Sequence, residues 1–223
     1  NWPHDGVDFT NIRVGVIGTG SSAIQSTPII AEQAQSLTVF QRTPNYSIPA
    51  YNEPLDPDYV AQLKSRYAEY RQENWARGFG ADFNDNDQSA FDVSDDERQQ
   101  AYEERWAKGG LAFLAAYNDL VFDMHANDTA RAFFKSKIAA RVDDPSLTEK
   151  LVPSTPIGCK RLCVDTHYYE IYNQAHVSLV DLNETPITRI EGNAILTGTI
   201  RCEVDAIVLA TGFDAMTGAV MNI

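Results

Sequence analysis

One stretch near the start of the chain, residues 13–43, constrains the fold more than any other. It opens with a short apolar, β-branched run at 13–17 that shows no polar alternation, which is typical of a parallel strand buried on both faces. A turn of the form G-x-G-x-x-A follows directly, then a helix predicted over 21–35 and a second apolar strand at 37–40. This order of elements predicts the beginning of a dinucleotide-binding fold.

The small residues of the turn have separate roles in such a fold. Gly18 permits the tight turn, Gly20 lets backbone N–H groups approach a pyrophosphate, and Ala23 lets the helix pack closely on the strand. The helix then directs its N-terminus, the positive end of its dipole, at the phosphates.

The end of the second strand indicates which dinucleotide is bound. An NAD site would place Asp or Glu there, whereas this chain has Gln41, Arg42 and Thr43. A carboxylate would repel a 2′-phosphate, but a guanidinium and a hydroxyl bind one, so we expect NADP. The alternative is that Arg42 is only a solvated cation at a strand end.

Composition narrows the class of protein. The chain of 223 residues is 43% hydrophobic and carries a formal charge of −13, which indicates a globular core and argues against nucleic acid or an anionic membrane as the main partner. Outside residues 49–152 there are six Lys and Arg residues, and three of them are Arg42, Lys160 and Arg161. An anionic ligand in an otherwise acidic lobe requires such a concentration of cations.

Several sequence features predict a cytoplasmic protein without metal. No run approaches the roughly 20 apolar residues of a membrane span, and no signal region opens the chain. Cys159, Cys163 and Cys202 show no metal spacing and are expected to be free thiols. Both ends appear cut, so we expect a fragment of a larger flavoprotein; a complete protein that begins in a loop is the alternative.

A helical insertion is predicted at 49–152, where strand signals are absent. Asp56 and Pro57 begin a helix whose Tyr and Leu spacing runs on to Tyr70, and a capping box at 94–97 begins another that ends at 109–110. Helical spacing continues over 111–121 and 130–142, and Asp144 caps a last short helix. The aromatic stripes are expected to be core, and the polar run 78–88 a mobile surface loop.

The sheet is predicted to resume after the insertion. We expect a helix over 166–174, a strand at 177–182, a meander of 187–190, 194–197 and 200–204, and a final buried strand at 205–210. The fold class is therefore α/β: a Rossmann-like NADP-binding domain, with a central parallel sheet and a β-meander, formed by 1–48 and 153–223. The all-α helical subdomain 49–152 interrupts it.

Four motifs together carry a resemblance to a known family. These are the G-T-G-S-S-A-I-Q turn, the Q-R-T-P after the second strand, the G-C-K-R-L segment and the V-L-A-T-G-F-D exit. They resemble the NADP-binding domain of a Baeyer–Villiger monooxygenase, and the resemblance covers essentially all 223 residues. Trp2 and Pro3 look like the end of a longer signature of this family. Ala23 stands where many relatives have Gly, and the FAD-binding domain of the family is missing from the chain.

The resemblance implies an activity and a set of site residues. In such an enzyme NADPH reduces FAD, and the reduced flavin and O₂ convert a small-molecule ketone to an ester or lactone. The resemblance gives Arg161 as the catalytic cation beside the flavin and Lys160, with Arg42 and Thr43, as the site of the 2′-phosphate. The expected cofactor-binding residues are Gly18, Thr19, Gly20, Ser21, Ser22, Ala23, Gln25, Arg42, Thr43, Lys160, Ala210, Thr211 and Gly212.

Other interpretations stay open. An N-hydroxylating or flavin-containing monooxygenase shares the glycine turn and the Ala-Thr-Gly exit, and the chain as it stands is also interpreted as a nucleotide-binding module without turnover. The pair Lys160 and Arg161 is alternatively a surface dipeptide that binds an acid such as Asp165. His4, His125, His167 and His176 accompany no nucleophile motif and are expected to be structural or surface residues.

Overall fold

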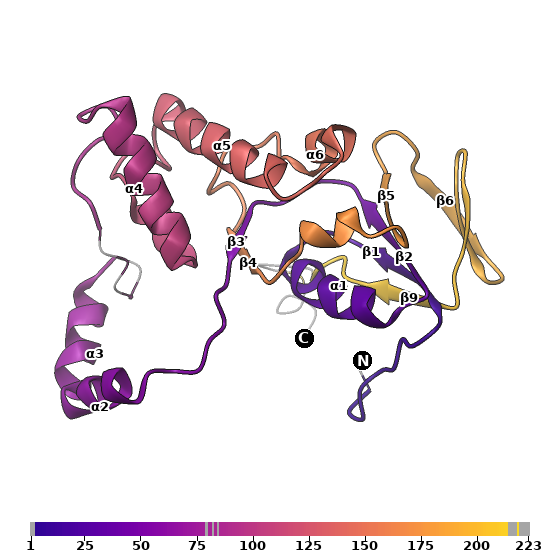
Figure 1. The fold of residues 1–223 in the computed structure, drawn as a ribbon, viewed down its shortest axis with the longest axis horizontal. Coiled ribbons are helices and arrows are strands. Elements are labelled where there is room, and N and C mark those ends of the chain that lie inside the picture. Colours follow the sequence, from indigo (N-terminus) through magenta and orange to yellow (C-terminus); the bar gives the residue numbers. More distant parts are fainter. Residues whose placement is uncertain (1–2, 79, 82, 84, 214–217, 219–223) are drawn as a thin grey trace.

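The computed structural model describes residues 3–78, 80–81, 83, 85–213 and 218 (Figure 1). Its central sheet has four strands in the order β5, β2, β1, β9. They are Val177–Asp181, Ser36–Gln41, Arg13–Ile17 and Ala206–Leu209, and every neighbouring pair is parallel. The predicted parallel sheet is confirmed. Trp2 and Asp214, which belong to two of the motifs, lie outside the described residues.

Helix α1, Ser21–Gln33, packs on this sheet and ends two residues before the predicted boundary. Ala23 and Ile24 on the helix are fully buried in one cluster with Val16 and Leu37 on the strands. The small side chain at Ala23 therefore lies at the contact between helix and strand, as the turn motif predicts.

A separate antiparallel meander follows β5. Strands β6 (Ile187–Glu191), β7 (Ala194–Thr197) and β8 (Arg201–Glu203) pair in that order. Ile195 of β7 packs with Phe40 and Val180, so the meander packs against the parallel sheet. The predicted meander is confirmed.

Strand β9 differs from the prediction of a buried strand. It is the outer strand of the sheet in the described residues, and Leu209 is 70% exposed. The apolar run 205–210 indicated a strand correctly, but its depth depends on strand order, which the run does not encode. The Arg13 guanidinium on β1 forms ion pairs with Glu203 and Asp205, at 2.6 and 2.8 Å, and so joins β1 to the segment that leads into β9.

The insertion is helical, as predicted, although its segmentation differs. It contains α2 (Pro57–Ser65), α3 (Tyr67–Ala76), α4 (Asp95–Lys108), α5 (Met124–Ala139) and α6 (Pro145–Leu151). Asp56 and Asp144 cap α2 and α6, and Ser94 with Glu97 forms the capping box of α4. Residues 111–115 form a 3₁₀ helix followed by turns, so continuous helical spacing over 111–121 was a wrong interpretation.

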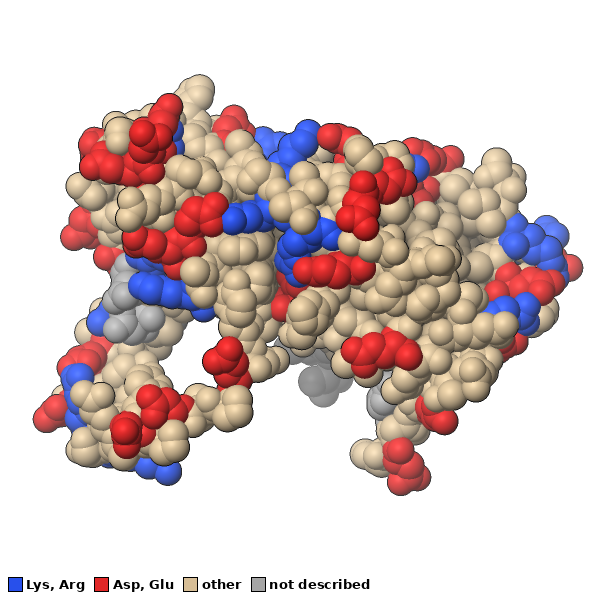
Figure 2. All heavy atoms as spheres, viewed as in Figure 1, with Lys and Arg blue, Asp and Glu red and all other residues tan. Residues whose placement is uncertain are grey.

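The first two helices of the insertion also correct the sequence interpretation. The backbone leaves the helical region at Arg66 (φ −120°, ψ 24°), which divides the expected single helix. Neither α2 nor α3 has a buried residue, and Tyr59 and Tyr67 are 52% and 54% exposed. Their aromatic stripe is therefore not core. Figure 2 shows an opening between this hairpin and the body of the molecule.

One parallel strand pair was not predicted from the sequence. Strands β3 (Ser47–Pro49) and β4 (Cys163–Asp165) pair across the insertion, and each has three residues. The helix predicted over 166–174 is instead a 3₁₀ turn, Glu170–Asn173. His167 has a positive φ of 60°, a conformation that cannot begin an α-helix, and the buried rings of Tyr168 and Tyr169 fix the chain that follows.

In the part of the chain that the structure describes, no helix is long and apolar enough to cross a membrane, and no cluster of three or more His, Cys, Asp or Glu side chains has the geometry of a metal site. The three cysteines are free thiols.

Candidate functional site

The glycine turn lies against the exit of strand β9. Gly18 has a φ of 116°, and a Cβ on it would lie 2.3 Å from the carbonyl oxygen of Ala210. Both its conformation and this close approach require glycine. The turn thus joins the ends of β1 and β9, which neighbour each other in the sheet but are almost 200 residues apart in the chain.

The N-terminus of α1 opens beside this turn. Its N-cap residue is Gly20, no side chain caps the helix, and no acidic residue lies in its first turn. A Cβ on Gly20 would have no atom within 4 Å. The first amide N–H groups of the helix therefore lack a side-chain acceptor, and the space beside Gly20 is open, which suits the binding of an anion.

Two hydrogen bonds fix the end of β2, one from the glycine turn and one from the segment after β5. The Thr19 hydroxyl donates to the Thr43 carbonyl oxygen at 2.7 Å, and the Asn183 amide donates to the Arg42 carbonyl oxygen at 2.6 Å. Thr19 is buried, so its hydroxyl is used inside the protein. The backbone of Arg42 and Thr43 is fixed in this way, and the Arg42 side chain remains exposed.

A cavity of about 290 Å³ collects residues from four separate segments. Its lining is Gly18, Thr19, Gly20, Arg42, Asn45, Lys160, Ala210, Thr211 and Gly212. Eight of these residues were expected from the sequence. Asn45 was not, because no motif marks it; its amide donates to the Cys163 thiol sulfur at 3.2 Å. The remaining expected residues, Ser21, Ser22, Ala23, Gln25, Thr43 and Arg161, do not line this cavity.

The cations at the site have no acidic partner within the described residues. Arg42, Lys160 and Arg161 form no ion pair there, whereas Arg13 and Arg189 are paired with Asp or Glu. Asp165 binds Arg141 at 2.6 Å, so the alternative in which it neutralises Lys160 and Arg161 is not what the structure has. Three positive charges are available to an anionic ligand.

Lys160 and Arg161 lie at the junction of two cavities. Lys160 lines both the glycine-turn cavity and a second cavity of about 300 Å³, and Arg161 lines the second one. Most of that second lining is apolar, and half of its residues come from the helical insertion, namely Phe83, Leu111, Leu114 and Ala115. The dipeptide therefore connects a polar, cationic cavity to an apolar one.

Cys163 and His176 lie near these elements without features of reactive groups. Burial raises the pKa of the Cys163 thiol. Nε2 of His176 lies 2.9 Å from the Ala31 carbonyl oxygen. His4, His125 and His167 are exposed and line neither of the two cavities.

The parallel sheet, the glycine turn and the cationic cavity define a dinucleotide-binding domain of the Rossmann type. No family model matches the chain. Among curated proteins, a cyclopentanone 1,2-monooxygenase from Comamonas sp. is 40% identical over 100% of this chain and 41% of its own length. A cyclohexanone 1,2-monooxygenase from Acinetobacter sp. is 38% identical over 97% of this chain and 40% of its own.

Solved structures give the same match. A steroid monooxygenase bound to NADP is 54% identical, with a TM-score of 0.94 over 99% of this chain and 42% of its own. OTEMO in complex with FAD and NADP is 38% identical, with a TM-score of 0.95 over 100% of this chain and 43% of its own. Over its full length the chain is therefore homologous to Baeyer–Villiger monooxygenases, and it spans about two fifths of the length of the relatives it matches.

Proposed function

We propose that this chain is the NADP(H)-binding portion of an FAD-dependent Baeyer–Villiger monooxygenase. In this assignment 1–48 and 153–223 form the nucleotide-binding domain, 49–152 form the helical insertion, and the FAD-binding domain belongs to the longer protein. The observation that carries the proposal is the cavity in which the glycine turn meets Arg42 and Lys160. The relatives support the class of reaction, since their names state that they oxygenate ketones.

The residues present fit NADP(H) by their chemistry. The space beside Gly20 is open where a Cβ would lie, the α1 N-terminus lacks a side-chain cap, and Arg42 and Lys160, which form no ion pair in the described residues, line the same cavity. In the assignment, α1 binds the pyrophosphate and Arg42, Thr43 and Lys160 bind the 2′-phosphate. When bound, NADPH supplies the hydride that reduces FAD in this class of enzyme.

The test of the nucleotide assignment is calorimetric titration of the chain with NADP⁺ and NAD⁺. We expect a preference for NADP⁺ of about 1.5–3 kcal/mol, roughly tenfold or more, because charged groups bind the 2′-phosphate. Arg42→Ala should remove most of that preference, and Arg189→Ala, an exposed arginine on the meander, should keep it. Equal binding of both nucleotides by the parent chain, or a preference that survives Arg42→Ala, would contradict the assignment.

The second cavity supports a role for Arg161 in oxygenation. The apolar residues around it suit a ketone, and an exposed guanidinium at its mouth stabilises negative charge that develops on oxygen. In the proposal, the ketone is oxygenated at this junction: one atom of O₂ enters the ester or lactone, and the other leaves as water with the two electrons that NADPH would supply through FAD. A cytoplasmic location is part of the same proposal, and the free cysteines support it.

Arg161→Ala in the full-length enzyme separates the two half-reactions. We expect ester or lactone formation to fall by a factor of about 10² or more, because a fixed charge beside the reacting oxygen is lost, while reduction of FAD by NADPH persists. Product analysis and anaerobic flavin absorbance measure these separately. Normal ketone oxygenation by the variant would remove Arg161 from the mechanism.

A second candidate reaction is N-oxygenation. A phenazine N-monooxygenase from Lysobacter antibioticus is 36% identical over 98% of this chain, so an oxygen-accepting nitrogen also occurs in a relative. Parallel assays of the full-length protein on a cyclic ketone and on an aromatic N-heterocycle distinguish the two. The chain by itself is proposed to bind nucleotide without turnover.

A further inference from the structure

The loop that carries Lys160 and Arg161 is exposed in its middle and fixed at both ends. The two cations are exposed, whereas Ile157 and Leu162 on either side are each 2% exposed. The loop has no helix or strand between Leu151 and Cys163 that would hold it by backbone pairing. The contacts that fix its position must therefore come from side chains of other segments.

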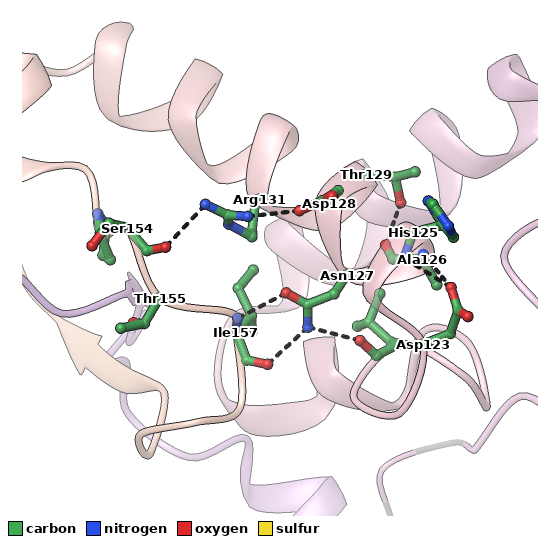
Figure 3. A network of polar contacts seen from close by, with 12 residues as sticks. Asp123, His125, Ala126, Asn127, Asp128, Thr129, Arg131, Ser154, Thr155 and Ile157 are labelled. Atoms are coloured by element: carbon green, nitrogen blue, oxygen red, sulfur yellow. Dashed lines mark hydrogen bonds and ion pairs between the residues drawn. The ribbon is translucent and has the colours of Figure 1, made fainter.

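The upstream end is held by Asn127, in the first turn of α5. Its amide nitrogen donates to the carbonyl oxygens of Leu120 and Ile157, both at 2.9 Å, and its amide oxygen accepts from the Ile157 N–H at 3.0 Å (Figure 3). The carboxamide thus pairs with both polar groups of one peptide residue, as a neighbouring strand would. Asn127 is 2% exposed, so water does not replace these bonds readily.

Further contacts hold the same end of the loop to α5. Arg131, one turn later on the helix, donates to the Ser154 carbonyl oxygen at 3.1 Å and binds Asp128 at 2.6 Å (Figure 3). Gly158 has a φ of 95°, and a Cβ on it would lie 3.0 Å from Val121, just before the helix. Only Gly158 and Cys159 separate Ile157 from Lys160, so this anchor lies next to the cations.

The downstream end is held just beyond the other end of α5. Arg141, two residues after the helix, binds Asp165 at 2.6 Å, and the Asp165 side chain is fully buried. The Ser47 hydroxyl donates to the same carboxylate at 2.6 Å. Helix α5 and the turn after it therefore contact both ends of the loop, together with the Tyr46 hydroxyl, which donates to the Pro153 and Thr155 carbonyl oxygens at 3.0 Å, and the pairing of β4 with β3.

We infer that α5 acts as a splint for the Lys160 and Arg161 loop and that Asn127 is a positioning residue for these two cations. The inference rests on the proposed function in one respect, since that function has Lys160 bind the 2′-phosphate. Asn127 does not line the nucleotide cavity and acts through the position of Lys160. Removing the carboxamide leaves three buried backbone groups without hydrogen-bond partners: the Ile157 N–H and the carbonyl groups of Leu120 and Ile157. Because unpaired buried polar groups are unfavourable, we expect the loop to move outward to reach water. The helical insertion thus contributes to nucleotide discrimination through Asn127.

Two measurements on the same variants test the inference. Amide hydrogen exchange reports on segment 154–162 without any ligand, and calorimetry gives the ratio of the NAD⁺ and NADP⁺ dissociation constants. The variants are Asn127→Ala and Asn127→Asp, the second of which keeps the acceptor for Ile157 but loses both donors. Tyr102→Phe is the matched control, because it removes a hydrogen bond to Thr129 within the same cluster, and no hydrogen bond joins Tyr102 to segment 154–162 in the described residues.

In both Asn127 variants we expect the backbone amides of residues 154–162 to exchange hydrogen about tenfold faster, while the amides of α4 and of the sheet keep their protection. The preference for NADP⁺ should fall roughly threefold to tenfold, mainly through weaker NADP⁺ binding, with NAD⁺ binding retained. Tyr102→Phe should change neither quantity. If Asn127→Ala does not accumulate in folded form, Arg131→Met, a more exposed member of the same anchor, should show a smaller change in the same direction.

The outcomes separate the two proposals. Unchanged exchange in 154–162 overturns the splint, whatever the nucleotide data show. Faster exchange with an unchanged preference for NADP⁺ overturns the positioning role of Asn127. A parent chain that binds both nucleotides equally, or neither, overturns the proposed function and with it the positioning of a 2′-phosphate contact, and the exchange result then decides the splint alone.

Discussion

The two halves of the helical insertion contain similar residues and use them in opposite ways. In α4 and α5, Tyr102 and Phe134 are almost fully buried in a cluster of aromatic rings. In α2 and α3, Tyr59 and Tyr67 are more than half exposed, and Trp75 is 85% exposed. Both halves show aromatic residues at helical spacing.

The difference lies in the contacts that each half makes with distant segments. Phe134 packs on Tyr46, which lies between the nucleotide-binding strand end and β3, and Asn127 and Arg141 join α5 to the loop after the insertion. Hairpin α2–α3 packs mainly on itself. Helical periodicity predicts the helix, but the partner that covers its apolar face comes from elsewhere in the chain.

The largest expected change in stability is for a substitution in the half of the insertion that contains α4 and α5. Phe134 is fully buried, and its ring lies 4.8 Å from Phe113 and 5.3 Å from Trp106, measured between ring centroids. Phe134→Ala leaves a cavity among these rings and should lower the free energy of unfolding by about 3–5 kcal/mol. Urea denaturation followed by circular dichroism measures this. A loss below about 1 kcal/mol would mean that the cluster is not a packed core.

A smaller effect is expected from pH on the same cluster. Burial raises the pKa of Tyr102 to about 12, whereas the phenol of the unfolded chain ionises near pH 10. Because the folded pKa is the higher one, the stabilisation is complete below about pH 10 and is lost as the pH rises toward 12. The free energy of unfolding should fall by about 1 kcal/mol between pH 9 and 11 from this group. Tyr102→Phe should lack that part; equal slopes for both proteins would refute it.

The smallest change in stability is expected for a substitution in the half that contains α2 and α3. Trp75 is 85% exposed on α3, where no residue is buried. Trp75→Ala should therefore change the free energy of unfolding by less than about 0.5 kcal/mol in this chain. The measurement is the same urea titration, followed by circular dichroism. A loss above 1 kcal/mol would show that the hairpin packs on the body and would remove the contrast between the halves.

Local patterns in the sequence determined much of the secondary structure, both in the nucleotide-binding part and in the insertion. The β-branched run, the glycine turn and the caps at Asp56, Ser94 and Asp144 act over a few residues, and each appears where it was predicted. The same holds for the meander, whose turn is marked by Gly192. Most of the cavity lining followed from these motifs, because parallel strands bring their carboxyl ends to one edge.

Tertiary structure alone decided the rest, because the contacts concerned join residues far apart in the chain. Strand order places β9 at an edge of the sheet in the described residues, and the pairing of β3 with β4 joins segments on either side of the insertion. The positive φ of His167 prevents the helix expected after β4. Asn45 and Asn127 stand in no cofactor-binding motif, and their roles depend on which polar groups the fold brings within reach of a carboxamide. Sequence periodicity determined which segments are helices, whereas long-range packing decided which of their aromatic faces became core.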